Sequence, residues 1–173
     1  MNTKTHFSSN RQDHETPDSL FNRLHERLRF TIDGAANAQN SKLKRFWGPG
    51  SKLAKDSLAI SWEGERVWLN PPYGRECKKF IKKAYEEGQK PGTLVCCLIA
   101  ARTDTAAFHD YILHSQLVYF IRGRLRFLLD GDLQDAAPFP SMVVIFNGDK
   151  KDKTEKPKFF TMSAARKKRL EGK

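Results

Sequence analysis

The stretch "TLVCCLIAA", residues 93–101, constrains the fold of this chain more than any other segment. From Leu94 onward it contains no polar residue, so neither face of a strand formed here is suited to exposure to water. Such a strand is typical of a parallel sheet with both faces covered by helices. After this run, apolar residues recur at 103–114 with the spacing of one helix face, which predicts a helix there. An apolar helical face also precedes the run, and it consists of Cys77, Phe80, Ile81, Ala84 and Tyr85. Strands that alternate with amphipathic helices predict an α/β fold.

The same alternation extends over the rest of the chain. We expect a helix over 16–30 with Thr16 as its cap and Pro17 in its first turn, and another helix capped by Thr103. Short strands are expected at 30–34, 58–62, 67–69, 116–121 and 141–146, the last being the final strand. Residues 122–129 either continue the strand before them or form a hairpin.

The length of 173 residues fits one domain. We expect a flexible polar segment at 1–14, a catalytic domain at 15–149 and a basic tail at 150–173. The net charge is +11, and the tail alone has ten Lys or Arg against three Asp or Glu. This tail is either a solvated end or a contact for nucleic acid.

The chain shows no apolar segment typical of a signal peptide or a membrane span. Cys96 and Cys97 are expected as buried thiols, outside any disulfide or zinc pattern. His109 and His114 have no third ligand nearby, so no metal is expected. These features predict a cytoplasmic protein without a membrane partner, and they leave its oligomeric state unknown.

A second stretch, "VWLNPPYGR" at 67–75, ends a predicted strand with two prolines, which cannot donate to a sheet ladder. The prolines fix the loop, so the Asn70 side-chain oxygen and the Pro71 carbonyl can accept hydrogen bonds from one planar amino group. Two acceptors favour a pyramidal nitrogen whose lone pair points toward an electrophile. The Tyr73 ring can stack on the group that bears the amine. The alternative is a plain turn at Pro71 and Pro72 with Tyr73 packed in the core.

Polar clusters follow three of the predicted strands, at 33–36, 70–73 and 101–104. In open α/β sheets, ligands bind outside the carboxyl ends of the strands. The three clusters therefore predict one binding site at that edge of the sheet.

An ordered set of segments over residues 15–147 resembles the Dam-like phage-type DNA adenine-N6 methyltransferases, which use S-adenosylmethionine. The segments are "TPDSLF", "FTIDGAA", "NSK", "DSLAISW", "VWLNPPYG", "IAARTDTAAFHDYI", "FIRGRLRF" and "PFPSMVVIF". The resemblance implies a Rossmann-like methyltransferase fold, a mostly parallel twisted sheet with helices on both faces. The distance from Asp33 to Trp68 is short for two full βα units, so this part is expected to be abbreviated.

The resemblance also implies roles for the matching residues. Asp33 would bind the methionine part of S-adenosylmethionine through its ammonium group. The other cofactor-binding candidates are Thr16, Pro17, Phe21, Ala35, Ala36, Asn40 and Asp56. The catalytic candidates are Asn70, Pro71, Pro72 and Tyr73, which would hold and stack a target adenine. The adenine would be flipped out of a duplex or lie in a single strand.

Charged residues in two places are candidates for DNA contact. Arg102 and Asp104 either position the substrate, or Asp104 belongs to the charged start of a helix. Arg122, Arg124 and Arg126 alternate along a strand-like stretch and would share one face. They either meet phosphates or form an exposed charged edge. With no long segment left for a separate recognition domain, recognition would use loops such as 42–57 or 129–139, or the tail.

The sequence therefore predicts an adenine-specific DNA methyltransferase, phage or prophage encoded, acting in the host cytoplasm. Two alternatives remain. The same amine chemistry could act on RNA or on protein glutamine, or the chain could be a DNA-binding module without catalysis.

Overall fold

The computed structural model describes residues 15–149 and 157–164; expectations for 1–14, 150–156 and 165–173 lie outside this range. One six-stranded sheet has the order β1-β2-β3-β7-β4-β8. Its strands are β1 (Ile32–Asp33), β2 (Arg66–Leu69), β3 (Leu94–Ala100), β4 (Leu117–Arg122), β7 (Ser141–Asn147) and β8 (Lys158–Ser163). Strands β1, β2 and β3 are parallel, with Ile32 opposite Val67 and Trp68 opposite Cys96. Strand β7 is antiparallel to β3 and β4, and β8 is parallel to β4. The expectation of a mostly parallel sheet is confirmed.

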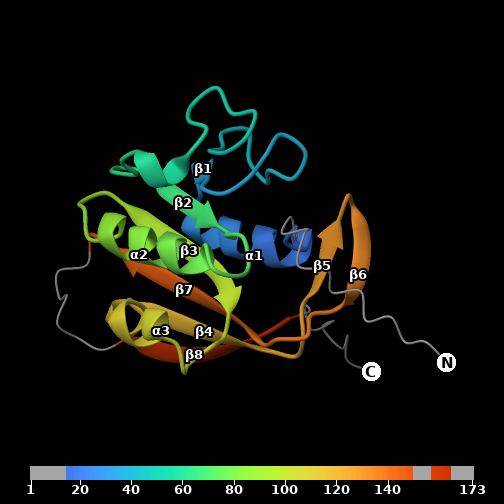
Figure 1. Ribbon diagram of the computed structural model, residues 1–173. Helices are drawn as coiled ribbons and strands as arrows, with labels where there is room; N and C mark the ends of the chain where they lie inside the picture. The colour runs from blue at the N-terminus through green and yellow to red at the C-terminus, as the bar shows by residue number, and fades with distance from the viewer. Residues whose placement is uncertain (1–14, 150–156, 165–173) are drawn as a thin grey trace, which may run out of the picture.

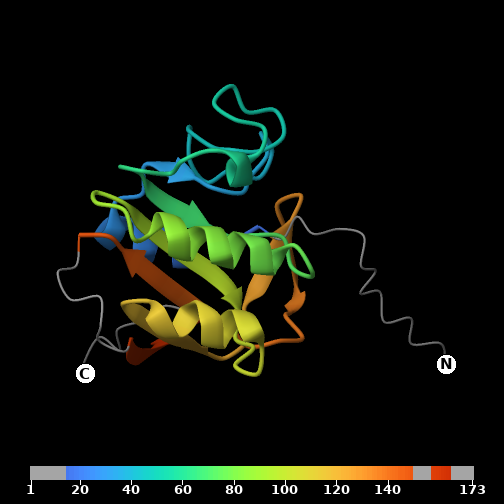
Figure 2. The ribbon, with the colours of Figure 1, turned by 60° about the vertical axis from the view of Figure 1, so that its left-hand side comes forward.

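Helices cover both faces of this sheet, as expected (Figure 1). Helix α1 (Asp18–Leu28) packs on one face, where it shares a core cluster with Trp68, Cys96 and Leu98. Helices α2 (Cys77–Glu87) and α3 (Ala106–Asp110) pack on the other face, against side chains such as Cys97 and Ile99. The side chains of successive β3 residues therefore point to opposite faces of the sheet, and helices cover both faces. This explains why the strand is apolar throughout. Figure 2 shows α2 and α3 lying side by side over the sheet.

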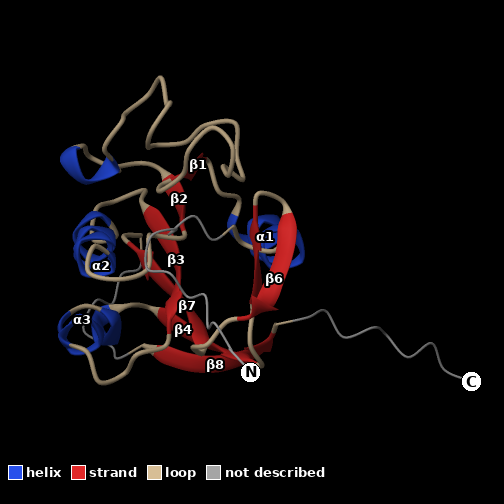
Figure 3. Ribbon diagram, turned by 45° about the vertical axis from the view of Figure 1, so that its right-hand side comes forward, coloured by secondary structure: helices blue, strands red, loops and turns tan. Residues whose placement is uncertain are grey.

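A separate hairpin joins β5 (Arg126–Leu129) to β6 (Asp132–Ala136) and lies on the same side as α1 (Figure 3). Asp130 and Gly131 form its turn, with φ of 52° and 83°. This Asp-Gly pair supplies the two positive φ values that a tight hairpin requires. Glu15 pairs with Leu128 of β5 and so ties the start of α1 to the hairpin.

Two strand predictions are wrong. Residues 58–62 contain no strand; the short 3-10 helix η1 (Ser57–Ala59) overlaps this stretch, and Trp62 is fully buried with its indole N–H donating to the Ser57 carbonyl. The strand at 141–146 is not the final one, because β8 follows it and pairs with β4 along its whole length. The sheet thus extends past residue 149 into the segment predicted as a basic tail.

Two predicted caps are also wrong. Pro17, not Thr16, directly precedes α1, and Thr16 is buried beside it. Thr105, not Thr103, caps α3 by accepting from the Phe108 N–H at 3.3 Å. A second 3-10 helix, η2 (Ile112–His114), completes the segment after α3.

The three arginines at 122–126 do not share one strand face, contrary to the prediction. Arg122 ends β4, Gly123 turns the chain with a φ of 88°, and Arg126 begins β5 in the separate hairpin. All three arginines are exposed. In the ranges 15–149 and 157–164, no helix is long and apolar enough to span a bilayer.

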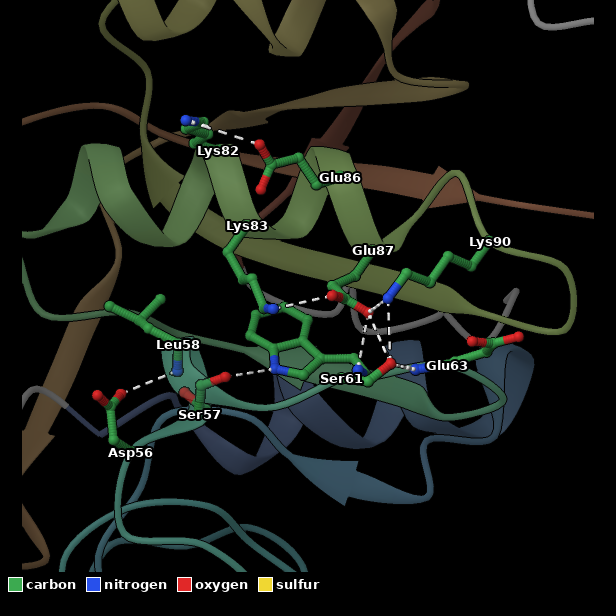
Figure 4. A network of polar contacts seen from close by, with 11 residues as sticks. Asp56, Ser57, Leu58, Ser61, Glu63, Lys82, Lys83, Glu86, Glu87 and Lys90 are labelled. Atoms are coloured by element: carbon green, nitrogen blue, oxygen red, sulfur yellow. Dashed lines mark hydrogen bonds and ion pairs between the residues drawn. The ribbon is translucent and has the colours of Figure 1, made fainter.

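A polar network joins the end of α2 to the loop before β2 (Figure 4). The buried carboxylate of Glu87 accepts hydrogen bonds from Lys83 and Lys90, each at 2.8 Å, and from the Trp62 backbone N–H at 2.8 Å. Burial acts to raise the pKa of Glu87, but these hydrogen bonds outweigh it and hold the pKa below its usual value. The network therefore stabilises the folded state at neutral pH and weakens as the pH falls below the range of an ordinary glutamic acid.

Replacing Glu87 by alanine is expected to lower the free energy of unfolding by about 2–3 kcal/mol, because two ammonium groups and a buried N–H lose their acceptor. Urea denaturation at pH 7.5 measures this loss. Glu86→Ala is the matched control on the same helix, since within residues 15–149 and 157–164 the exposed Glu86 carboxylate pairs with Lys82 alone, at 3.7 Å. Glu86→Ala should lower the free energy of unfolding by less than about 0.5 kcal/mol. Equal losses of unfolding free energy in the two variants would contradict the stabilising role of Glu87.

Candidate active site

The side chain of Asp33 lies at the carboxyl end of β1 and is 3% exposed. Its carboxylate accepts from the backbone N–H of Lys42 at 3.0 Å and, more weakly, from that of Ala35 at 3.4 Å. Burial raises the pKa of Asp33 to about 6, and the two N–H groups and the Lys42 charge offset it only in part. A buried carboxylate without an ionic partner at hydrogen-bond distance favours a cation beside it.

A cavity of about 50 Å³ lies against this carboxylate. Thr16 lines it, and the Thr16 hydroxyl is buried without a hydrogen-bond partner among the described residues. Buried hydroxyls are normally hydrogen-bonded, so this one favours a ligand in the cavity. The remaining lining residues are Glu15, Ala35, Ala36, Asn40, Lys42, Trp68, Asn70 and Pro72.

A second cavity of about 230 Å³ adjoins the first and shares four of its lining residues: Ala35, Ala36, Asn40 and Pro72. Asp56 lies on its wall, with Trp47 and the ring of Phe80 from α2. The two cavities form one groove from Asp33 to Asp56. An aromatic ring and a nearby carboxylate suit a flat heterocycle that carries hydroxyl groups.

The wall of this groove is a long loop, residues 34–56, in place of further strands. Backbone hydrogen bonds hold the loop to β1: the Trp47 N–H donates to Asp33, and the Ala36 N–H donates to Trp47. Gly48 has a φ of 140°, and a Cβ there would lie 2.0 Å from the Ala36 carbonyl. Only glycine allows this approach. Between β1 and β2 the structure has η1 and no further strand, so the expected abbreviation is confirmed.

The Asn70 loop begins directly after β2, whose Trp68 carbonyl accepts from Gly34 at the end of β1. Parallel pairing thus brings Asn70 and Asp33 to the same edge, and both line the first cavity. Pro71 is buried. The Tyr73 hydroxyl donates to the Asn70 side-chain oxygen at 3.5 Å, which orients the carboxamide.

The ring of Tyr73 packs against two aromatic rings from the hairpin region. Its centroid lies 5.7 Å from that of Phe127 in β5 and 4.9 Å from that of Phe139, which follows β6. Burial raises the pKa of Tyr73 well above its usual value, so the phenol stays a hydrogen-bond donor. Tyr73 is therefore part of an aromatic cluster as well as a neighbour of Asn70.

The other predicted site residues lie farther from this groove. Pro17 is outside both cavity linings, and Phe21 packs in the core, with its ring edge-on to Trp68 at 5.5 Å. Arg102 and Asp104 are exposed after β3, and both precede the start of α3. The sequence offered no pattern for Lys42, Trp68 and Phe80 as groove residues, since each reaches the groove through its place in the fold.

The neighbouring thiol of Cys77 is no nucleophile at neutral pH. Burial raises its pKa to about 11, although the charge of Arg102 acts in the opposite direction. The described residues contain no group of three His, Cys, Asp or Glu side chains arranged to hold a metal ion. The groove thus offers a carboxylate, amide and carbonyl acceptors, and aromatic rings.

Comparison with known families decides between the amine chemistries. Residues 3–172 match the family described as DNA N-6-adenine-methyltransferase (Dam). The chain belongs to this Dam family. Two phage proteins named DNA N-6-adenine-methyltransferase are similar to it. That of Haemophilus phage HP1 is 26% identical over 122 residues, 69% of this chain and 68% of the relative. That of Escherichia phage T1 is 28% identical over 106 residues, 60% of this chain and 42% of the relative.

Membership of the Dam family assigns the reaction class, methylation of adenine N6 in DNA. It disfavours both alternatives raised from the sequence, because the family's description names DNA rather than RNA or protein as the substrate, and names a methyltransferase rather than a binding module without catalysis. A methyltransferase family implies S-adenosylmethionine in general terms. For this Dam-family chain, the open question is which residues bind cofactor, adenine and DNA.

Proposed function

We propose that the groove from Asp33 to Asp56 binds S-adenosylmethionine and presents its methyl group to an adenine amine held at Asn70. The observation that carries the proposal is that Asn70 and Asp33 line the same cavity. The 50 Å³ cavity would take the methionine part, and the adjoining 230 Å³ cavity the adenosine part. When bound, the cofactor supplies a methyl group on a positively charged sulfur.

The residues of the groove fit this cofactor. The Asp33 carboxylate would pair with the ammonium group, and the unpartnered Thr16 hydroxyl would hydrogen-bond the amino-acid end. Asp56 would accept from the ribose hydroxyls. Its carboxylate already accepts from the Leu58 N–H at 2.9 Å, which fixes its orientation. Phe80 and Pro72 would pack on the adenine ring of the cofactor.

The Asn70 side-chain oxygen and the Pro71 carbonyl form the proposed amine-binding pair. Accepting both N–H bonds of adenine N6 would turn the nitrogen lone pair toward the first cavity, where the methyl group is expected. The Tyr73 hydroxyl would keep the Asn70 oxygen directed at the amine. The nitrogen gains a methyl group and releases one proton to water, so no enzyme nucleophile is needed.

A target adenine would stack on the ring of Tyr73, beside Phe139. A base inside a duplex cannot reach Asn70, so the adenine must leave its stack. Arg102 and Arg122 lie at the ends of parallel strands β3 and β4 and are exposed, as is Arg124. We assign them to phosphate contacts that hold the flanking DNA. We further propose the cytoplasm of a bacterial host as the setting, supported by the phage relatives.

Nucleoside mass spectrometry tests the proposal directly. The purified chain, given S-adenosylmethionine and adenine-containing duplex DNA, should produce N6-methyladenine. Matched reactions with RNA or with protein should leave no methylated product. Absence of N6-methyladenine from the DNA, in a protein shown to be folded, would contradict the proposed function.

A further inference from the structure

A third cavity, of about 340 Å³, lies between α2 and α3 on the face of the sheet opposite α1. Figure 2 shows the two helices that border it. Its volume falls within the range of small-ligand pockets and is larger than either part of the cofactor groove. Tyr73 and Arg102 on its wall have roles in the proposed function, but its interior has none.

The floor of this cavity is apolar. It consists of Ile81, Ile99, Ala107, Ile112 and Met142. Thr105 also lines the cavity, but its hydroxyl is already engaged, donating to the Arg102 carbonyl at 2.9 Å and accepting from the Phe108 N–H. Apart from the Cys77 thiol, the interior side chains are apolar or already hydrogen-bonded, so the interior suits a flat apolar group.

The rim of the cavity is cationic. Arg75, Lys78 and Arg102 line it and are exposed, and their side chains form no ion pair or hydrogen bond with residues 15–149 or 157–164. This distinguishes Lys78 from Lys79, Lys82 and Lys83 of the same helix, which pair with Glu76, Glu86 and Glu87. Asp104 lies on the same loop as Arg102 but does not line the cavity. Three unpartnered cations around an apolar interior complement a ligand with a flat ring and an anionic end.

The cavity adjoins the target site without being part of it. Tyr73 forms part of its wall, whereas Asn70 and Pro71 do not line it. A base bound there could not present its amine to the amine-binding pair. It would instead lie beside Tyr73, which lines this cavity and neither cavity of the cofactor groove, at the place of a neighbouring nucleotide in the same strand.

We propose that this cavity binds a second nucleotide of the DNA, the direct neighbour of the target adenine, with its base on the apolar floor and its phosphate at Arg75 and Arg102. The proposal rests on DNA being the substrate. Binding of two adjacent unstacked bases near Tyr73 would hold the target strand open, and the apolar floor would accept any base at the neighbouring position.

Duplexes that carry one abasic site, on the 5′ or the 3′ side of the target adenine, test the proposal. For the unmodified protein, loss of the neighbouring base on one side should weaken DNA binding about tenfold, and loss on the other side should change it less than twofold. Ala107→Leu places three more carbon atoms on the cavity floor and obstructs a base there, so both abasic duplexes should then bind like the intact duplex. Arg75→Ala, at an exposed position, should weaken binding of the intact and the abasic duplexes by similar factors, because an abasic site loses the base and keeps its phosphate. Arg29→Ala removes an exposed cation from the end of α1 and should leave the tenfold penalty unchanged.

Equal binding of the unmodified protein to intact and abasic duplexes would overturn the proposal. A full penalty retained in Ala107→Leu would also overturn it, and so would binding of the intact duplex by Arg75→Ala at the unmodified affinity. If Ala107→Leu fails to fold, Arg75→Ala alone decides. Mass spectrometry of the intact duplex is run in parallel. If the intact duplex acquires N6-methyladenine but the abasic duplexes bind as tightly as the intact one, the second-nucleotide site is wrong and the proposed function stands. If the intact duplex acquires no N6-methyladenine, the proposed function itself is wrong.

Discussion

Replacing Asn70 by alanine is expected to lower the rate of methyl transfer about 100- to 1000-fold, because the adenine amine loses one of the two acceptors that direct its lone pair. The effect should appear in single-turnover rates of N6-methyladenine formation at saturating DNA and S-adenosylmethionine. Cofactor affinity should change less than threefold, since the Asp33 carboxylate and the Thr16 hydroxyl are untouched.

Asn70→Asp is the matched variant, because it keeps an oxygen acceptor at the same position and replaces the amide nitrogen by a second, negatively charged oxygen. It should retain more activity than the alanine variant. Tyr73→Phe removes the hydroxyl that contacts Asn70 at 3.5 Å and keeps the ring, so a smaller loss is expected. If Asn70→Ala methylated DNA at the unmodified rate, the amine-binding pair would be wrong.

Replacing Asp33 by asparagine should abolish cofactor binding measurable by calorimetry and leave the unliganded protein at least as stable. The pKa of Asp33 is raised from 3.8 to about 6, so ionising this buried group costs the folded state about 3 kcal/mol at neutral pH. This cost is absent below pH 3.8 and grows as the pH rises toward 6. Asparagine removes it, and also removes the charge that would bind an ammonium group.

The same shift predicts a pH dependence of cofactor affinity. Only the carboxylate binds the ammonium group, so affinity should be flat above pH 7 and fall about tenfold per pH unit below pH 6. Glu63, exposed in the loop before β2, offers a control, and Glu63→Gln should keep this profile. An affinity independent of pH between 5 and 8 would contradict the role of Asp33.

The sequence was sufficient to predict the core of the sheet and the edge at which Asp33 and Asn70 meet. Strand β3 follows from an unbroken apolar run, and the Asn70 loop follows from two prolines after a strand. Asp33 could be placed beside Asn70 because parallel neighbouring strands end at one edge. These features depend on local residue chemistry and on one general rule of α/β sheets.

Other features depend on contacts that local patterns do not encode. Thr103, Asp104 and Thr105 are all good helix caps, and only packing selects Thr105. The stretch ending at Trp62 has strand-like residues, but the indole N–H reaches back to Ser57 and favours a helical turn. Strand β8 follows a charged segment, and its Phe159 and Phe160 are both about half exposed, so it shows no alternation of buried and exposed residues.

Strand β8 also bears on how the chain can be shortened. It supplies the hydrogen-bonding partner for all of β4, its rings stack on Tyr119 and Phe120, and Ser163 accepts from Arg23 of α1. A version of the protein ending at residue 149 would leave the backbone of β4 and two aromatic side chains open to water. Unpaired strand edges of this kind associate with one another. Removal of the basic residues for solubility or crystallisation should therefore start after Ala164, where β8 has ended and β4 keeps its partner.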